Sequence, residues 1–222
     1  MRRPAVHQGV LPTHLPDEAE RVRERFARRK QAHKGYSYFH PGKLFIVQGR
    51  ERKFLEVLKK LGLDRLDDKG ILEVGCGSGG LLRGFLDWDA RPENLYGVDL
   101  LADRVWEAKA RSPHLHILQG NAEHLPFPDR RFDLVLQSTV FTSVLDGDAK
   151  RQIAHEMRRV LRDDGVMLWY DFRYDNPQNP DVRGIGRREI AGLFPGCALE
   201  FHTLTLAPFL ARAVAPRSWA LC

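Results

Sequence analysis

A glycine-rich loop is the segment of this sequence best suited to bind a ligand. It reads Glu73-Val-Gly75-Cys-Gly77-Ser-Gly79-Gly80 and lies between a short apolar run and a helical pattern. Glycines let the backbone turn sharply and approach a ligand closely, here at a helix N-terminus whose first N–H groups are free. A tight turn alone does not require four glycines within residues 75–80. The loop therefore predicts a ligand site.

An acidic residue follows this loop at the end of the next apolar run, YGVD. Gly75, Gly77 and Gly80 satisfy the G-x-G-x-x-G fingerprint of dinucleotide-binding proteins. Asp99 stands at about the distance, roughly 20 residues, at which that fingerprint places its ribose-binding acid. The pattern thus predicts an adenosine-containing cofactor and leaves a nicotinamide dinucleotide open.

Short apolar runs alternate with helical patterns from residue 70 onward. The runs are ILEV, NLYGV, LHILQ, FDLVLQ and VMLWYDF, and a sixth strand is predicted at ALEFHTLTL, residues 198–206. This alternation is typical of βα units. It predicts an α/β fold with a doubly wound, mostly parallel sheet and helices on both faces. Ligands of such sheets bind beyond the carboxyl ends of the strands, where the glycine loop and Asp99 fall.

The first 62 residues are predicted to form an arm and a helical cap that belong to the same domain as the cofactor-binding part, 63–222. Asp17 is expected to begin a helix that runs to about residue 33. A second, amphipathic helix is expected to end near Gly62.

The break between these two helices carries Tyr36, Tyr38 and His40 between two glycines. Such a segment suits a lid that hinges at its ends and stacks in its middle. The alternative for its aromatic residues is core packing of the helical cap.

Residues at the strand ends distinguish between possible cofactors. Glu73 suits a cationic amino-acid group and would repel a pyrophosphate, and Asp99 is placed to accept from both ribose hydroxyls. Leu100 is placed to pack on an adenine, and Asn121-Ala122 follows the third strand. Together these features resemble the cofactor site of the class I (Rossmann-like) S-adenosylmethionine-dependent methyltransferase family.

This resemblance covers residues 70–172 in motif order and implies S-adenosylmethionine as cofactor and S-adenosylhomocysteine as product. The expected acceptor is a small molecule, of natural-product or sugar-like type. The cofactor-binding residues that it implies are Glu73, Gly75, Cys76, Gly77, Gly79, Asp99, Leu100, Asn121, Ala122 and Gln137. Cys76 is interpreted as a small apolar residue of the loop and not as a nucleophile. The family also implies seven strands, one more than the sequence predicts, and this departure affects the acceptor side.

The acceptor-binding and catalytic residues are predicted from their positions. Methyl transfer from a sulfonium is an in-line displacement that needs alignment and exclusion of water, so a base is optional. Asp171, after the fifth strand, and His40 are the candidates for that base. The residues expected to bind the acceptor are Tyr36, Tyr38, Ser138 and Arg173.

The net charge of +6 and the basic stretch 21–30 raise the possibility of nucleic-acid binding. Glutamates interleaved with these cations instead predict a solvated amphipathic helix. The fourth strand is followed by QSTV and not by the Asn/Asp-Pro-Pro-aromatic stretch in which base-amino methyltransferases resemble one another. A nucleic-acid methyltransferase, an NAD-dependent oxidoreductase and a non-catalytic binding module with this fold are the alternatives.

The remaining composition favours a cytoplasmic protein without metal. Three cysteines without paired spacing indicate a reducing compartment. No run approaches the roughly 18 apolar residues of a membrane-spanning helix, so no membrane association is expected. His114 and His116 have no third ligand at a recognisable spacing. The oligomeric state is left open.

Overall fold

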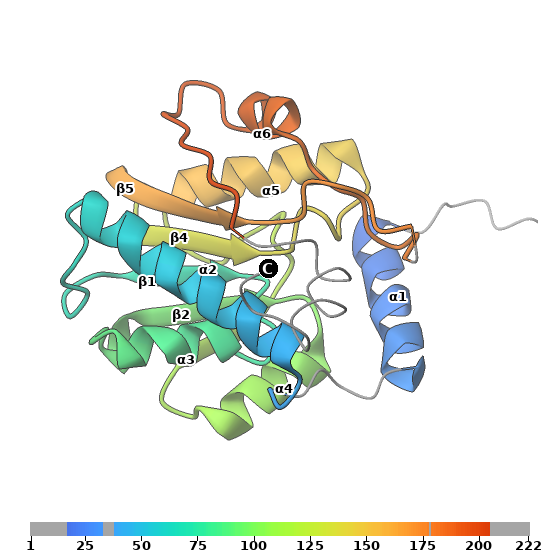
Figure 1. Ribbon diagram of the computed structural model, residues 1–222, viewed down its shortest axis with the longest axis horizontal. Coiled ribbons are helices and arrows are strands. Elements are labelled where there is room, and N and C mark those ends of the chain that lie inside the picture. The colour runs from blue at the N-terminus through green and yellow to red at the C-terminus, as the bar shows by residue number, and fades with distance from the viewer. Residues whose placement is uncertain (1–16, 33–37, 178, 205–222) are drawn as a thin grey trace, which may run out of the picture.

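A five-stranded parallel sheet forms the centre of the protein, as seen in a computed structural model that describes residues 17–32, 38–177 and 179–204 (Figure 1). The strand order is β3-β2-β1-β4-β5, and all four neighbouring pairs are parallel. The strands are β1 (Ile71–Val74), β2 (Leu95–Asp99), β3 (His116–Gln119), β4 (Phe132–Ser138) and β5 (Leu161–Tyr170). All their carboxyl ends therefore meet at one edge of the sheet.

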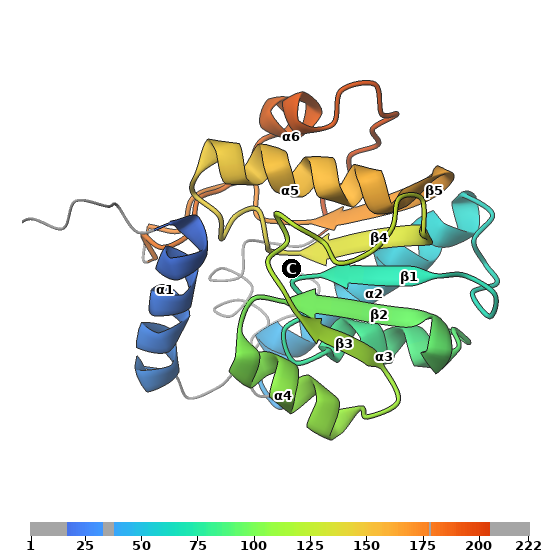
Figure 2. The ribbon, with the colours of Figure 1, turned by 180° about the vertical axis from the view of Figure 1, so that it is seen from behind.

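Helices cover both faces of this sheet (Figures 1 and 2). One face packs against α2 (Pro41–Lys60), α3 (Gly80–Asp87) and α4 (Ala102–Arg111), and the other against α5 (Gly147–Val160) and α6 (Arg187–Leu193). A single 3-10 turn, η1 (Pro92–Asn94), precedes β2. Successive residues of a strand point to opposite faces, so Ile71 joins the first core and Leu72 the second. The predicted doubly wound fold is confirmed.

The two N-terminal helices take different positions. The first, α1 (Glu18–Ala32), lies beyond the carboxyl ends of the strands and begins after Asp17, whose carboxylate accepts from the Glu20 amide. The second, α2, buries Phe54 and Leu58 in the core with the sheet. Only α1 is thus placed as a cap, whereas α2 is a layer of the fold. The boundary at residue 62 stays a prediction.

The predicted sixth strand is wrong over its described part, because residues 198–204 form no strand. Alternating apolar residues predict one buried side but do not supply a partner strand for the backbone. Phe201 packs against the core on the α5 face, while Glu200 pairs with Lys60. Side-chain contacts and not a hydrogen-bonded ladder therefore fix this segment. Residues 205 and 206 lie outside the described part.

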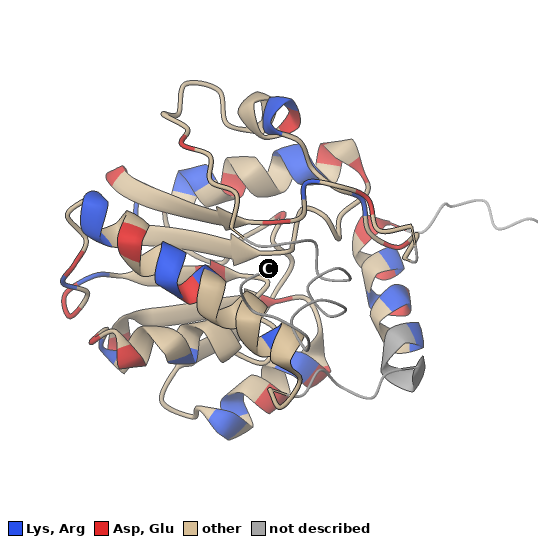
Figure 3. Cartoon of the chain, in the orientation of Figure 1, with Lys and Arg blue, Asp and Glu red and all other residues tan. Residues whose placement is uncertain are grey.

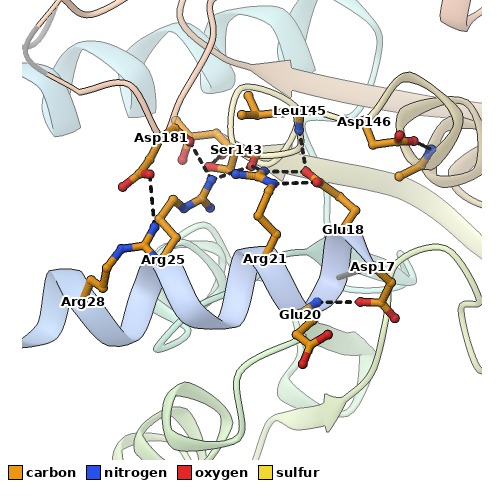
Figure 4. A network of polar contacts seen from close by, with 12 residues as sticks. Asp17, Glu18, Glu20, Arg21, Arg25, Arg28, Ser143, Leu145, Asp146 and Asp181 are labelled. Carbon is orange, nitrogen blue, oxygen red and sulfur yellow. Dashed lines mark hydrogen bonds and ion pairs between the residues drawn. The ribbon is translucent and has the colours of Figure 1, made fainter. Parts of the chain in front are cut away.

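A polar network attaches α1 to the two loops that follow β4 and β5 (Figure 4). The Glu18 carboxylate accepts from the Leu145 amide at 2.5 Å and pairs with Arg21. The Arg25 guanidinium donates to the carbonyl oxygens of Ser143 (2.5 Å) and Asp181 (2.7 Å). The side chain of Arg25 is fully buried, so the expectation of a solvated basic helix is wrong at this position. One arginine joins two loops that are far apart in sequence.

We predict that Arg25→Met lowers the free energy of unfolding by about 1–3 kcal/mol, because the Asp181 carbonyl oxygen loses its arginine donor and the Ser143 carbonyl oxygen keeps only that of Arg21. Arg28→Met is the matched control on the same helix. Arg28 is 62% exposed and its pair with Asp181 is long, at 3.4 Å, so its loss should have little effect. Urea denaturation of the two variants measures the difference, and equal stabilities would contradict this role of Arg25.

Candidate functional site

The glycine loop folds into a tight cradle between β1 and α3. Gly75, Gly77 and Gly79 all have positive φ angles, of 70°, 55° and 73°, which glycine adopts without steric cost. A β-carbon at Gly75 would also collide with the Val140 side chain. The amides of Gly75 and Cys76 donate to the Val98 carbonyl of β2. The loop is therefore attached to the neighbouring strand, with the N-terminus of α3 behind it.

Asp99 holds this cradle from the end of β2. Its carboxylate accepts from the Gly77 amide at 2.7 Å and from the Leu101 amide at 2.9 Å. Each carboxylate oxygen keeps a further acceptor position. Asp99 therefore shapes the loop and also has capacity for a ligand hydroxyl. Leu100, Asn121 and Ala122 line the same cleft.

Glu73 is a buried acid at the end of β1, with 3% of its surface exposed. Its Oε2 atom is buried and has no hydrogen-bond partner. Burial raises the pKa of Glu73 to about 8, the nearby Arg50 charge opposes this, and Asp99 adds to it. The carboxyl group is therefore protonated near neutral pH in the ligand-free protein and is suited to a cationic group.

Arg50, which the sequence analysis missed, faces Glu73 from α2. Its Nη1 donates to the Ser138 hydroxyl at 3.3 Å, and its guanidinium stands 5.7 Å from the Tyr170 ring centre. Its Nε is buried without a partner. Ser138 pairs in register with Tyr170 at the ends of β4 and β5. An unpaired acid and an unpaired cation thus stand together at the carboxyl edge.

Gln137 and Asp171 join the ends of β4 and β5. The Gln137 amide donates to Asp171 Oδ2 at 2.8 Å, and its Oε1 accepts from the Val140 amide. Asp171 Oδ1 accepts from the Thr142 hydroxyl at 2.6 Å. Burial raises the pKa of Asp171 to about 6, against these hydrogen bonds. Both carboxylate oxygens are engaged, so the contacts describe an acid that fixes the loop after β4.

The remaining predicted site residues differ in their burial and in their contacts. Cys76 is buried, and burial raises the pKa of its thiol, as expected of an unreactive cysteine. His40 accepts from the Gly42 amide and so caps α2. Tyr38 is 58% exposed, which argues against core packing, and Arg173 is also exposed. Tyr36 lies outside the described residues. The roles of all these residues in binding stay predictions.

None of the described helices is both long and apolar enough to cross a membrane. In the same part of the chain, no three metal-ligating side chains stand together.

The parallel sheet with its glycine cradle and Asp99 at the strand ends defines a Rossmann-like fold. Residues 72–169 match the family model described as a methyltransferase domain. A solved S-adenosylmethionine-dependent methyltransferase of Thermotoga maritima superposes with a TM-score of 0.53 at 20% identity, covering 78% of this chain and 77% of that one. The chain therefore contains a methyltransferase domain, and it shares the Rossmann-like fold of this methyltransferase.

Curated relatives match part of the chain. A fatty-acid O-methyltransferase of Mycolicibacterium smegmatis is 37% identical over 119 residues, which are 51% of this chain and 41% of that protein. A phthiotriol/phenolphthiotriol dimycocerosates methyltransferase of Mycobacterium ulcerans is 36% identical over 149 residues, or 62% and 54%. The chain thus spans about half the length of these relatives.

The buried Glu73 predicts a pH-dependent stability. Its pKa is raised from an ordinary 4.5 to about 8, so its contribution to stability is full below pH 4.5 and is lost as the pH rises to about 8. Glu73→Gln should therefore make the ligand-free protein more stable than the parent at about pH 7.5, by roughly 1–3 kcal/mol. Urea midpoints measured across this range for both proteins check it. The exposed Glu93→Gln is the control, and parallel pH profiles for Glu73→Gln and the parent would refute the assignment.

Proposed function

We propose that this protein transfers a methyl group from S-adenosylmethionine to a small-molecule acceptor and releases S-adenosylhomocysteine. The observation that carries the proposal is the pair Glu73 and Arg50, whose buried polar atoms lack partners beside the glycine cradle. The two opposite charges match the ammonium and carboxylate ends of an amino acid. The methionine part of the donor is such a group.

The residues present fit this donor along its length. Glu73 would receive its ammonium group and Arg50 its carboxylate. The free acceptor positions of Asp99 would take the ribose hydroxyls, and Leu100, Asn121 and Ala122 would surround the adenine. A pyrophosphate in the same cradle would meet the Glu73 carboxyl group, so the site favours the sulfonium donor over a nicotinamide dinucleotide.

When bound, the donor supplies an electrophilic methyl group on a sulfonium. The protein aligns the acceptor with that group and excludes water. Thr142, Gln137 and Asp171 fix the loop after β4, and α1 covers this end of the sheet and fastens the same loop through Ser143. These contacts define the wall against which an acceptor would rest. The names of the relatives support a small lipid-like acceptor for this chain.

A nucleic-acid acceptor is less well supported. Lysines and arginines alternate with acidic residues on the helices (Figure 3). On α1, Arg21 and Arg25 are bound to the loops, and Arg28 lies near Glu24 and Asp181. A phosphate backbone needs a continuous set of available cations. Among the described residues, α1 does not present one.

Calorimetry with S-adenosylhomocysteine and NAD tests the donor. We expect binding of the first and none of the second. Asp99→Asn should weaken S-adenosylhomocysteine binding by roughly 10- to 100-fold, because charged hydrogen bonds to ribose become neutral ones. The exposed Asp64→Asn should bind like the parent. Tight NAD binding without a response to S-adenosylhomocysteine would exclude the proposed function.

Donor binding should also release a proton. At about pH 6.5 the Glu73 carboxyl group is protonated in the free protein, whereas the ligand's α-amino group is already cationic. Pairing the two ionises Glu73, so S-adenosylhomocysteine binding should release close to one proton. The binding heat will then vary with the ionisation enthalpy of the buffer. Glu73→Gln removes that variation, and buffer-independent heats in the parent would disprove the Glu73–ammonium contact.

A further inference from the structure

A second cation faces the cleft from α2, two helical turns before Arg50. Lys43 and Arg50 are seven residues apart, so they share one side of the helix at a rise of about 10 Å. The N-terminal half of α2, which carries both, lies toward the carboxyl ends of the strands (Figure 1). Lys43 lines the same cleft as Asp99 and Ser138. Both cations therefore lie where they could contact a ligand in the cleft.

Neither cation has an acidic partner among the described residues. The Lys43 ammonium stands 4.8 Å from the centre of the Tyr38 ring, and Arg50 contacts Ser138 and Tyr170. Of the lysines further along α2, Lys53 pairs with Glu56 and Lys60 with Glu200. Partial burial and the charge of Arg50 lower the pKa of Lys43. The cleft thus holds two cations that form no salt bridge with a described carboxylate.

Two such cations exceed what the proposed donor requires. The donor carries an ammonium, a sulfonium and a single carboxylate. If Arg50 takes that carboxylate, while Glu73 and Asp99 face the ammonium and the ribose, Lys43 is left without an anionic partner. The acceptor is the remaining component that can supply one.

We propose that the acceptor is a carboxylic acid with an apolar body and that Lys43 binds its carboxylate. This inference rests on the proposed function and names its substrate class. The Tyr38 ring holds the Lys43 ammonium by a cation–π contact, which makes Tyr38 a positioning residue. Val22 and Phe26 of α1, with Val140, line the cleft and would contact the apolar body.

A carboxylate acceptor also agrees with the state of the two candidate bases. Asp171 uses both oxygens to hold Thr142 and Gln137, and Nδ1 of His40 caps α2. A carboxylate is already an anion at neutral pH, so no proton has to be removed. Its oxygen forms the new C–O bond with the methyl carbon as the S–CH₃ bond breaks and its electron pair stays on sulfur. The products are a neutral ester and a neutral thioether.

Dodecanoate and dodecanol test the proposal in two assays. The first measures dodecanoate binding by calorimetry in the presence of saturating S-adenosylhomocysteine. The second measures methyl transfer to each compound from labelled S-adenosylmethionine. We expect dodecanoate to bind and to be esterified, and dodecanol to be methylated at least tenfold more slowly.

Three variants separate Lys43 from its neighbours. Lys43→Met should raise the Kd and the KM for dodecanoate by about tenfold or more and leave S-adenosylhomocysteine affinity within about twofold. Lys43→Arg should restore most of the loss, and Lys59→Met, an exposed lysine of α2, should behave as the parent.

The possible failures are distinguishable. Absence of S-adenosylhomocysteine binding in the parent would refute the proposed function itself. Donor binding without dodecanoate binding, equal methylation of dodecanol, or an unchanged dodecanoate Kd in Lys43→Met would overturn the carboxylate proposal and leave the methyltransferase proposal intact.

Discussion

The burial of one carboxyl group, that of Glu73, is the constraint on which the arrangement of the site depends. Alternation along β1 places Glu73 on the same face as Ile71, beneath α2, where apolar residues surround it. Removing a charge from water is costly without a partner, so the carboxyl group keeps its proton and its pKa rises to about 8. The fold thus maintains a buried acid for which, under the proposed function, the ligand supplies the compensating cation.

The cleft walls depend on two further acids at neighbouring strand ends. Asp99 accepts from the Gly77 and Leu101 amides and so fixes the cradle beside β2. Asp171 accepts from Gln137 and Thr142 and fixes the loop beyond β4. Arg25 then joins that loop to the one after β5 through carbonyl oxygens. Hydrogen bonds that involve strand-end acids and one buried arginine therefore fix the glycine cradle and the loops that follow β4 and β5.

The fold and the positions of the glycine loop and its flanking acids were largely predictable because their signals are local. Periodicity predicts parallel strands, and the glycine loop with its flanking acids falls at known strand ends. The acceptor side depends on contacts across long stretches of sequence. Arg50 donates a hydrogen bond to Ser138, and Arg25 donates to Ser143 and Asp181. Neither the sequence QGRERK around Arg50 nor the basic stretch of α1 distinguishes these arginines from solvated ones. The alternation of apolar residues at 198–204 likewise indicated one buried side, but a strand also needs a neighbouring strand to pair with its backbone.

The surroundings of Arg25 and Arg50 distinguish them from the other cations of this basic protein. Surface lysines such as Lys60 have carboxylates nearby and gain little from a ligand. Arg25 satisfies backbone carbonyls and serves the fold. Arg50 has a buried donor without a partner, next to an acid that also lacks one, and these two cannot satisfy each other at their present separation. A zwitterionic group between them would satisfy both, which is why the proposed function places the amino-acid end of the donor there.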